Sequence, residues 1–259
     1  VGGDDVVLLA VKSQDTVAAL ESLRSEAPDV SVACLQNGVA NEREALRRFA
    51  RVQAVNVMLP AGHLERGEVA AFSSPVTGLL DVGRYPDGID DLTEALVDAF
   101  GSSTFDARAV PDVMRWKYAK LLMNLGNALQ ALTGPGPSTA DAYRLLHAEA
   151  VACFEAASIS FASREEDRER RGDLMAIADV PGQSRGGGSS WQSVVRATGS
   201  IETDHLNGEV VLLGRLHGVP TPANAQLQAL ATDAARRRLP PGSIDAAELT
   251  TLLAEATTP

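Results

Sequence analysis

Three polar side chains share one face of an otherwise apolar segment near the middle of the sequence. The segment is KLLMNLGNAL, and its polar residues are Lys120, Asn124 and Asn127. Positions i, i+4 and i+7 of an α-helix lie on one face. A buried lysine costs free energy unless a partner compensates its charge. The stripe therefore either faces bulk water or lines a cleft that uses an ammonium and two amides. Because the remaining faces are apolar and asparagine is a mediocre helix former, we favour the cleft.

A second polar set precedes an apolar run in SIETDHLNGEVVLLG. It consists of Glu202, Asp204 and Asn207. A carboxylate that faces Lys120 would compensate the charge of a buried ammonium. The alternative for Glu202 alone is an exposed position on a helix surface. Together with the lysine, Glu202 becomes a candidate site residue.

The glycine run 186–188 lacks the preceding strand and the Lys-Ser/Thr of a phosphate-binding loop. We interpret it as a mobile loop before a helix that carries Ser189 and Ser190. Ser189 and Gln192 have the spacing of a capping box at the start of that helix. The four histidines show no spacing typical of metal ligands, and no cysteine pair has zinc spacing. We predict no metal site.

Strands and helices alternate through the first hundred residues. Three apolar runs have the length of buried parallel strands: DVVLLAVK, SVACLQNG and VQAVNVML. The alternation predicts a right-handed, parallel α/β sheet, and ligands bind such sheets outside the carboxyl ends of the strands. Lys12 follows the first strand and Asn37 follows the second. Both are therefore candidate ligand-binding residues.

From about Val110 the periodicity becomes helical. We expect helices over 110–134, 140–159, 189–218 (one helix or a pair) and 221–238. The charge-dense stretch SREEDRERRGD between them is interpreted as a solvated helix face. The sequence therefore predicts an α/β sheet followed by helices.

The composition restricts the classes of molecule that the protein is expected to bind. The chain has 34 acidic and 23 basic residues, a net charge of -11, which argues against nucleic acid and anionic membrane surfaces. No apolar run reaches the roughly 18 residues of a membrane span. Cys34 and Cys153 lie in apolar runs, as buried thiols do in a reducing compartment, and a cytoplasmic location is expected. A small-molecule substrate is the expected partner, and the apolar helical half favours a homodimer.

Four segments, in order, resemble the ketopantoate reductase (2-dehydropantoate 2-reductase) family. They are VLLAVKSQDT, CLQNGVANE, WKYAKLLMNLGNAL and SSWQSVVRATGSIETDHLNGEVVLLGRLHGVPTPAN. The resemblance covers nearly the whole chain. It implies a Rossmann-like parallel sheet whose N-terminal part is missing, in residues 1–108, followed by an all-α helical domain in residues 109–259. It also implies an active site in the cleft between the two domains.

The resemblance further implies NADPH-dependent reduction of 2-dehydropantoate to pantoate. It makes Lys120 the general acid, and Asn124 and Ser190 substrate-binding residues. Glu202 becomes an acid that touches substrate and cofactor. Lys12 and Asn37 are matched to residues that face NADP.

The sequence departs from the family pattern at three places. No glycine-rich fingerprint precedes the first strand, so we expect that segment to lie before Val1; the residue that would choose between NADPH and NADH is expected there too. Ala128 holds the position of the second family asparagine, and Asn127 substitutes for it as a substrate-binding residue. Thr203 stands where the family has an aliphatic residue, and Ser200-Ile201 replaces Arg-x-Thr. These changes keep open a reductase of another 2-oxo acid, a related opine- or hydroxyacid-type dehydrogenase, or a non-catalytic paralogue.

Overall fold

The computed structural model describes residues 2, 5–183 and 185–258 and divides them into two compact units. The first unit contains the described residues up to Ala61, together with Ala70–Leu121 and Phe161–Gln183. The second contains Gly62–Val69, Leu122–Ser160 and the described residues after Gln183. Helix α4 (Val113–Asn124) begins in the first unit and ends in the second. The expected division after residue 108 stays a prediction.

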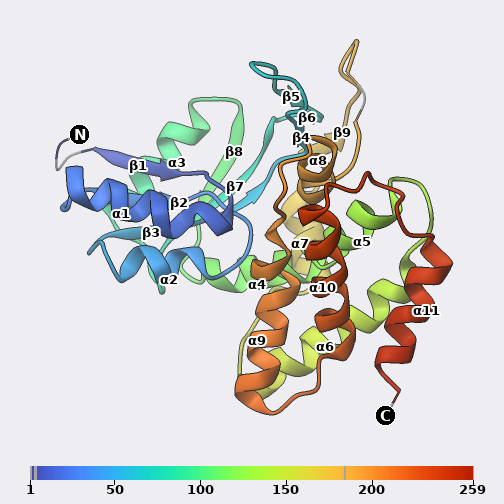
Figure 1. The fold of residues 1–259 in the computed structure, drawn as a ribbon. Helices are drawn as coiled ribbons and strands as arrows, with labels where there is room; N and C mark the ends of the chain where they lie inside the picture. Colours follow the sequence, from blue (N-terminus) through green and yellow to red (C-terminus); the bar gives the residue numbers. More distant parts are fainter. Residues whose placement is uncertain (1, 3–4, 184, 259) are drawn as a thin grey trace. The chain divides into compact units, whose positions relative to one another are not determined.

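A five-stranded sheet forms the centre of the first unit (Figure 1). Its order is β1-β2-β3-β7-β8, with β1, β2 and β3 parallel to one another and β7 parallel to β8. The strands are β1 (Val6–Leu9), β2 (Ser31–Cys34), β3 (Val52–Met58), β7 (Gly78–Arg84) and β8 (Phe105–Ala109). The Rossmann-like fold class is confirmed.

One strand runs against the expected direction, because β7 pairs with β3 antiparallel. Parallel neighbours require a crossover, usually a helix. The chain between β3 and β7 instead forms only the short strands β4 (Ala61–Gly62), β5 (Ala70–Ala71) and β6 (Ser73–Pro75). Without a crossover helix the chain returns in the opposite direction. The sheet is therefore mixed.

Helices α1 (Thr16–Glu26) and α2 (Asn41–Leu46) cover one face of this sheet, and α3 (Asp91–Gly101) covers the other. Successive strand side chains point to opposite faces. Val32 and Cys34 accordingly pack into the core under α1 and α2, while Ala33 packs into the core under α3. The near-continuous apolar strands of the sequence are explained by this burial on both faces.

Helix α7 (Arg164–Arg171) has the solvated face expected of the charge-dense stretch, with Arg164, Glu165, Arg168 and Glu169 exposed, but it buries Arg170. Arg170 is 7% exposed, and its guanidinium lies 2.6 Å from Asp81 Oδ1 and 2.6 Å from Asp106 Oδ1. The Asp81 carboxylate is buried in the middle of β7, where an unpaired charge would be costly. Arg170 supplies compensating charge together with Arg108, whose Nε lies 3.0 Å from Asp81 Oδ1.

After α7, strand β9 (Met175–Ile177) pairs antiparallel with β6.

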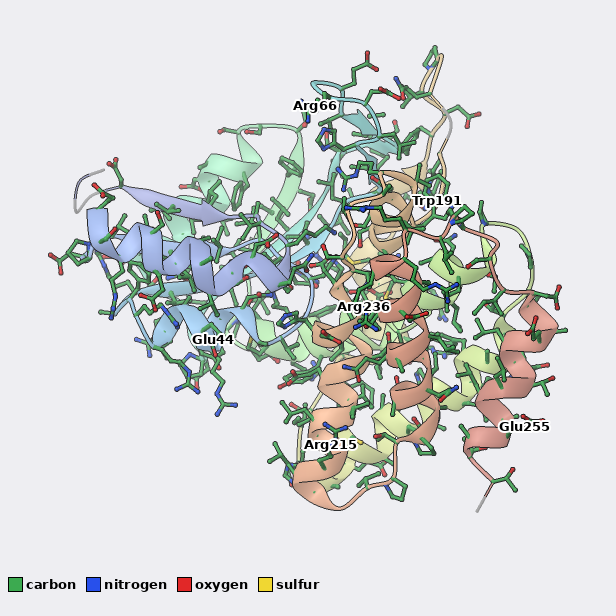
Figure 2. All side chains as sticks on the ribbon, viewed as in Figure 1. Glu44, Arg66, Trp191, Arg215, Arg236 and Glu255 are labelled. Atoms are coloured by element: carbon green, nitrogen blue, oxygen red, sulfur yellow. The ribbon has the colours of Figure 1, made fainter. Side chains whose placement is uncertain are left out.

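The second unit is helical, as expected for the C-terminal half. Its elements are α5 (Gly126–Thr133), α6 (Ala140–Ala156), α8 (Ser189–Val195), the 3-10 turn η2 (Glu202–His205), α9 (Asn207–His217), α10 (Pro222–Arg236) and α11 (Ala246–Ala256). Leucines fill the core, while charged side chains such as Arg215, Arg236 and Glu255 are exposed (Figure 2). The single helix expected over 110–134 is interrupted at Leu125. Among the described residues, no helix has both the length and the apolarity to cross a membrane.

The capping box expected at Ser189 and Gln192 is wrong. Helix α8 is capped by Gly188, whose N–H donates to Gln130 Oε1 at 2.7 Å. A Cβ at Gly187 would lie 2.5 Å from the Trp191 ring. The glycines therefore leave room for the Trp191 indole and let the backbone reach Gln130. The N-cap is consequently Gly188, one residue before the expected Ser189. Ser184, in the same loop, lies outside the described residues.

Candidate active site

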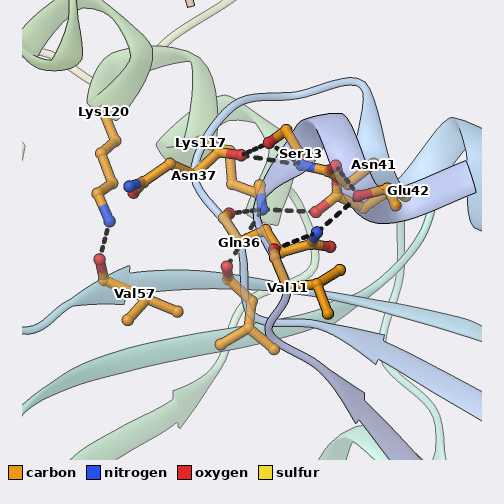
Figure 3. Close-up of polar contacts among 11 residues, drawn as sticks. Val11, Ser13, Gln36, Asn37, Asn41, Glu42, Val57, Lys117 and Lys120 are labelled. Carbon is orange, nitrogen blue, oxygen red and sulfur yellow. Dashed lines mark hydrogen bonds and ion pairs between the residues drawn. The ribbon is translucent and has the colours of Figure 1, made fainter. Parts of the chain in front are cut away.

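Polar side chains gather at the carboxyl ends of β1, β2 and β3 (Figure 3). Gln36 Nε2 donates to Val11 O at 2.8 Å and to Thr16 Oγ1 at 2.7 Å. Asn41 Nδ2 donates to Asn37 O at 2.8 Å. We call the whole set the strand-end network: Ser13, Thr16, Gln36, Asn41, Glu42 and Lys117, all buried. It ties together the loops that follow β1 and β2.

Lys117, on α4, is the cation of this network and is 3% exposed. Its Nζ lies 2.5 Å from Glu42 Oε1 and donates to Gln36 O at 2.9 Å and to Val55 O at 3.3 Å. An ammonium has three N–H donors, and three acceptors surround this one. Burial, and next the charge of Glu42, raise the pKa of the Cys34 thiol well above its usual range, while Lys117 acts in the opposite direction.

Sequence reasoning missed Lys117, although a signal was present. The chain has three lysines, Lys12, Lys117 and Lys120, against twenty arginines. Where arginine serves nearly every surface position, a lysine marks a place that requires an ammonium. All three lysines belong to the first unit.

Lys120 follows Lys117 by about one helical turn and donates to Val57 O (Figure 3). The parallel ladder between β2 and β3 ends at the pair Cys34–Ala54, but β3 continues to Met58. Alternate carbonyls of a strand point to the same side. The two lysines thus supply donors to Val55 O and Val57 O, beyond the last parallel pair.

Lys12 and Asn37 lie where the sequence placed them, after β1 and β2. Lys12 is half-buried and precedes a 3-10 turn, η1 (Ser13–Asp15). Asn37 is half-buried beside Gly38, whose φ of 79° favours glycine. The first unit therefore brings Lys12, Asn37 and Lys120 to the carboxyl ends of three adjacent strands, the usual ligand-binding edge of an open α/β sheet.

In the second unit, Asn127 lies beside Gly188, which directly precedes helix α8. A Cβ on Gly188 would lie 3.3 Å from Asn127 Oδ1, so this amide lies against the start of the helix that carries Ser190. Several buried oxygens of this unit have no hydrogen-bond partner among the described residues: Asn124 Oδ1, Ser189 Oγ, Ser190 Oγ and Thr203 Oγ1. Buried polar groups are normally paired, so this set offers acceptors and hydroxyls to a ligand.

The second polar set, Glu202, Asp204 and Asn207, divides by role. Glu202 is 3% exposed, which excludes the alternative of a surface carboxylate. Asp204 is exposed and accepts from Gln228 Nε2 at 2.8 Å. Asn207 is buried and donates to Leu125 O at 3.4 Å and to Asn224 Oδ1 at 3.0 Å, so its amide holds helices together. Glu202 fits a site, and Asn207 Oδ1 is a further buried oxygen without a hydrogen-bond partner among the described residues.

Residues of the first unit fit a dinucleotide cofactor. Lys12 and Asn37 present polar groups at adjacent strand ends, and the neighbouring Gln36 Oε1 is buried without a hydrogen-bond partner among the described residues. The fingerprint G-x-G-x-x-G, which holds a pyrophosphate, does not occur in residues 1–259. Within the described ranges, no group of three or more His, Cys, Asp and Glu side chains is arranged to hold a metal.

The fold and the polar strand ends define a Rossmann-type oxidoreductase with a helical second unit. Family models agree over most of the chain. Residues 2–86 match the model "Ketopantoate reductase PanE/ApbA", and residues 112–235 match "Ketopantoate reductase PanE/ApbA C terminal". The chain belongs to this family of NAD(P)-dependent oxidoreductases. The expected boundary at residue 108 falls between the two matched ranges.

Individual curated relatives share less than a third of their aligned residues with this chain. The 2-dehydropantoate 2-reductase of Caulobacter vibrioides is 28% identical over 242 residues, which cover 89% of this chain and 78% of that protein. The chain spans only 39% of the Pyrococcus abyssi 2-dehydropantoate 2-reductase, to which it is 27% identical over 120 residues, or 46% of this chain.

Solved structures show the same fold. A PanE/ApbA family ketopantoate reductase from Ralstonia eutropha JMP134 has a TM-score of 0.72 at 25% identity and covers 92% of this chain and 78% of its own. A D-mandelate dehydrogenase with NADH and anilino(oxo)acetate has a TM-score of 0.74 at 21% identity, covering 90% and 77%.

Proposed function

We propose that the protein reduces 2-dehydropantoate (ketopantoate) to pantoate with NADPH. The observation that carries the proposal is the arrangement on helix α4. Lys120 holds its ammonium at the end of β3, and one turn later Asn124 presents a buried carbonyl oxygen without a partner among the described residues. A 2-oxo acid that also carries a hydroxyl matches this pair of donor and acceptor.

Lys120 is the proton donor in this proposal. Reduction of a ketone leaves negative charge on its oxygen, and a positioned acid that protonates this oxygen lowers the barrier. The ammonium has three N–H groups, so it can donate to Val57 O and to a substrate oxygen together. NADPH, when bound, supplies the hydride.

The remaining residues bind and orient the substrate. Asn124 Oδ1 accepts from the substrate hydroxyl, and the Ser190 hydroxyl donates to its carboxylate. Asn127 lies against the start of the same helix and supports this contact. Glu202, as a buried carboxylate, accepts from a substrate hydroxyl and from the cofactor. Lys12 and Asn37 hold the nicotinamide end of NADPH.

A substrate panel tests the proposal. The intact protein is supplied with NADPH and, in turn, ketopantoate, pyruvate and 2-oxoisovalerate, and NADPH oxidation is followed by absorbance. Turnover selective for ketopantoate is expected. 2-Oxoisovalerate is the comparison, because it lacks the hydroxymethyl group whose hydroxyl Asn124 would bind. Equal rates for these two acids would contradict the assigned role of Asn124. The same assay with NADH decides the cofactor.

Thr203 favours a second candidate, a reductase of another 2-oxo acid. It is 1% exposed, and its hydroxyl has no hydrogen-bond partner among the described residues, where the family pattern has an aliphatic side chain. A substrate with an additional polar group would pair with it. Turnover of a different 2-oxo acid, with none on ketopantoate, supports this candidate and leaves Lys120 in its role.

We also propose that the protein is a cytoplasmic homodimer. Two free, buried cysteines support a reducing compartment, and the exposed Leu212 and Leu216 of α9 support self-association. Sedimentation of the purified protein is expected to give twice the chain mass. A monomer at micromolar concentration would contradict the dimer.

A further inference from the structure

Lys117 and Glu42 form a buried ion pair for which the proposed chemistry has no use. Their side chains are 2% and 0% exposed, and Nζ lies 2.5 Å from Oε1. Replacing a buried ion pair by well-packed apolar side chains is often neutral or stabilising. Stability alone therefore does not explain why this unit keeps two charges in its interior.

The contacts of Lys117 connect three segments. Two of them contain a candidate site residue, and the third accepts a hydrogen bond from one. Its own helix, α4, carries Lys120. Gln36 O, which it binds at 2.9 Å, directly precedes Asn37. Val55 O, at 3.3 Å, lies two residues before Val57, which accepts from Lys120.

Glu42 extends the connection to α2. It directly follows Asn41, whose side chain donates to Asn37 O at 2.8 Å and to Ser13 Oγ at 3.2 Å. The pair therefore fixes α4 against the ends of β2 and β3 and fixes the turn that carries Asn37. All of these residues belong to the first unit (Figure 3).

The choice of lysine fits this role. A tetrahedral ammonium directs three N–H groups to three separate acceptors. A guanidinium is planar, so its N–H groups cannot point in the same three directions. The chain uses arginine twenty times and lysine three times, yet lysine stands here.

We propose that Lys117 and Glu42 are positioning residues that hold Lys120 and Asn37 in register at the strand ends. The proposal rests on the proposed function, because it is the proton donor that they position. They act through α4 and the Asn37 turn and do not touch the substrate.

Paired substitutions test the proposal in the intact enzyme. Lys117→Met and Glu42→Gln each leave one buried charge uncompensated and lower the melting temperature. The double variant lacks both charges of this pair, so its melting temperature returns toward that of the wild type. Its kcat is expected to stay about tenfold to a hundredfold low, because a small misplacement of the acid is costly. Wild-type kcat in a stable double variant would overturn the proposal.

Two further variants guard against a fold defect. Lys117→Arg keeps the charge opposite Glu42 and hence the fold, yet kcat is expected to fall at least tenfold; full activity would contradict positioning. Arg170→Met removes a different buried cation from the same unit and serves as the matched control. It is expected to lower the melting temperature while kcat of the folded enzyme is unchanged.

A readout that needs no substrate separates this proposal from the proposed function. Reductive methylation, followed by mass spectrometry, measures how fast each lysine reacts. The chain has only three lysines, and Lys12 serves as the internal reference. In the double variant, the methylation rate of Lys120 relative to Lys12 is expected to change several-fold; an unchanged ratio would overturn positioning. If the wild type reduces no 2-oxo acid, the proposed function fails, but this ratio still decides whether Lys117 positions Lys120.

Discussion

Arg115 of helix α4 binds Glu166 of helix α7 through two parallel hydrogen bonds. The distances are 2.8 Å for Nη1 to Oε1 and 2.7 Å for Nη2 to Oε2. The same carboxylate accepts from the backbone N–H of Ser163 at 2.7 Å and completes a capping box. This relationship joins α7 to the part of α4 that carries Lys117 and Lys120, which belongs to the first unit.

The Arg115–Glu166 pair predicts an acid-dependent component of stability. Arg115, and next the cap at Ser163, lower the pKa of Glu166 to about 2. The unfolded value is about 4.3. A depressed folded pKa stabilises the protein above the unfolded pKa, and this contribution is lost as the pH falls from about 4.3 to about 2.

Urea unfolding of the wild type and of Arg115→Met checks this component. The difference in unfolding free energy is expected to be constant near neutral pH and to shrink across that acidic window. The exposed arginine Arg236, which pairs with Asp233 at 3.5 Å, provides the matched control as Arg236→Met. A difference that grows on acidification would contradict the assignment.

Both cysteines are expected to be unreactive in the folded protein. Burial, and next the charge of Glu149, raise the pKa of Cys153 to about 11. The pKa of Cys34 is raised well above its usual range by burial first. Since the thiolate is the nucleophile, little of it forms near pH 7. A thiol reagent is expected to label neither cysteine in the native protein and both in denaturant. Rapid labelling of the native protein would contradict this expectation and show that the core around the labelled cysteine opens.

Asn124 and Ser190 are predicted to matter for substrate and little for stability. Their buried oxygens Oδ1 and Oγ have no partner among the described residues, so alanine at either position removes no internal hydrogen bond of these atoms. Loss of a hydrogen bond to a charged or polar ligand raises KM by about tenfold to a hundredfold. Steady-state kinetics and thermal melting of Asn124→Ala and Ser190→Ala check both parts.

Asn224→Ala provides the contrast. Asn224 Nδ2 donates to Leu146 O at 3.1 Å and to Glu149 Oε2 at 2.8 Å, and its Oδ1 accepts from Asn207. Its removal is expected to cost roughly 1–3 kcal/mol of stability with KM unchanged. If Asn124→Ala instead destabilised the protein as strongly as Asn224→Ala and left KM unchanged, Asn124 would be a structural residue.

Local patterns predicted the parts of this molecule that depend on neighbours in sequence. The apolar runs gave the three buried strands because strands covered on both faces need no polar side. The spacing of Lys120 and Asn124 placed them one turn apart because helix geometry is local. The same holds for Lys12 and Asn37, which follow their strands directly.

The rest depended on partners that are distant in sequence. Nothing near Arg170 shows that Asp81 and Asp106 will surround it, so the local pattern does not separate Arg170 from the exposed residues of α7. Nothing near Lys117 shows Glu42. The direction of β7 follows from a missing crossover helix, which periodicity does not report. The capping box at Ser189 failed because Gln130, on another helix, binds the Gly188 N–H.

The most direct test of the account is the turnover of Lys120→Ala with ketopantoate and NADPH, measured beside NADPH binding and thermal melting. A missing general acid is expected to lower kcat by about 10²–10⁴-fold, while the dissociation constant for NADPH and the melting temperature stay close to those of the wild type. Wild-type kcat in a folded Lys120→Ala variant would show that another group protonates the product, and the central claim would be wrong.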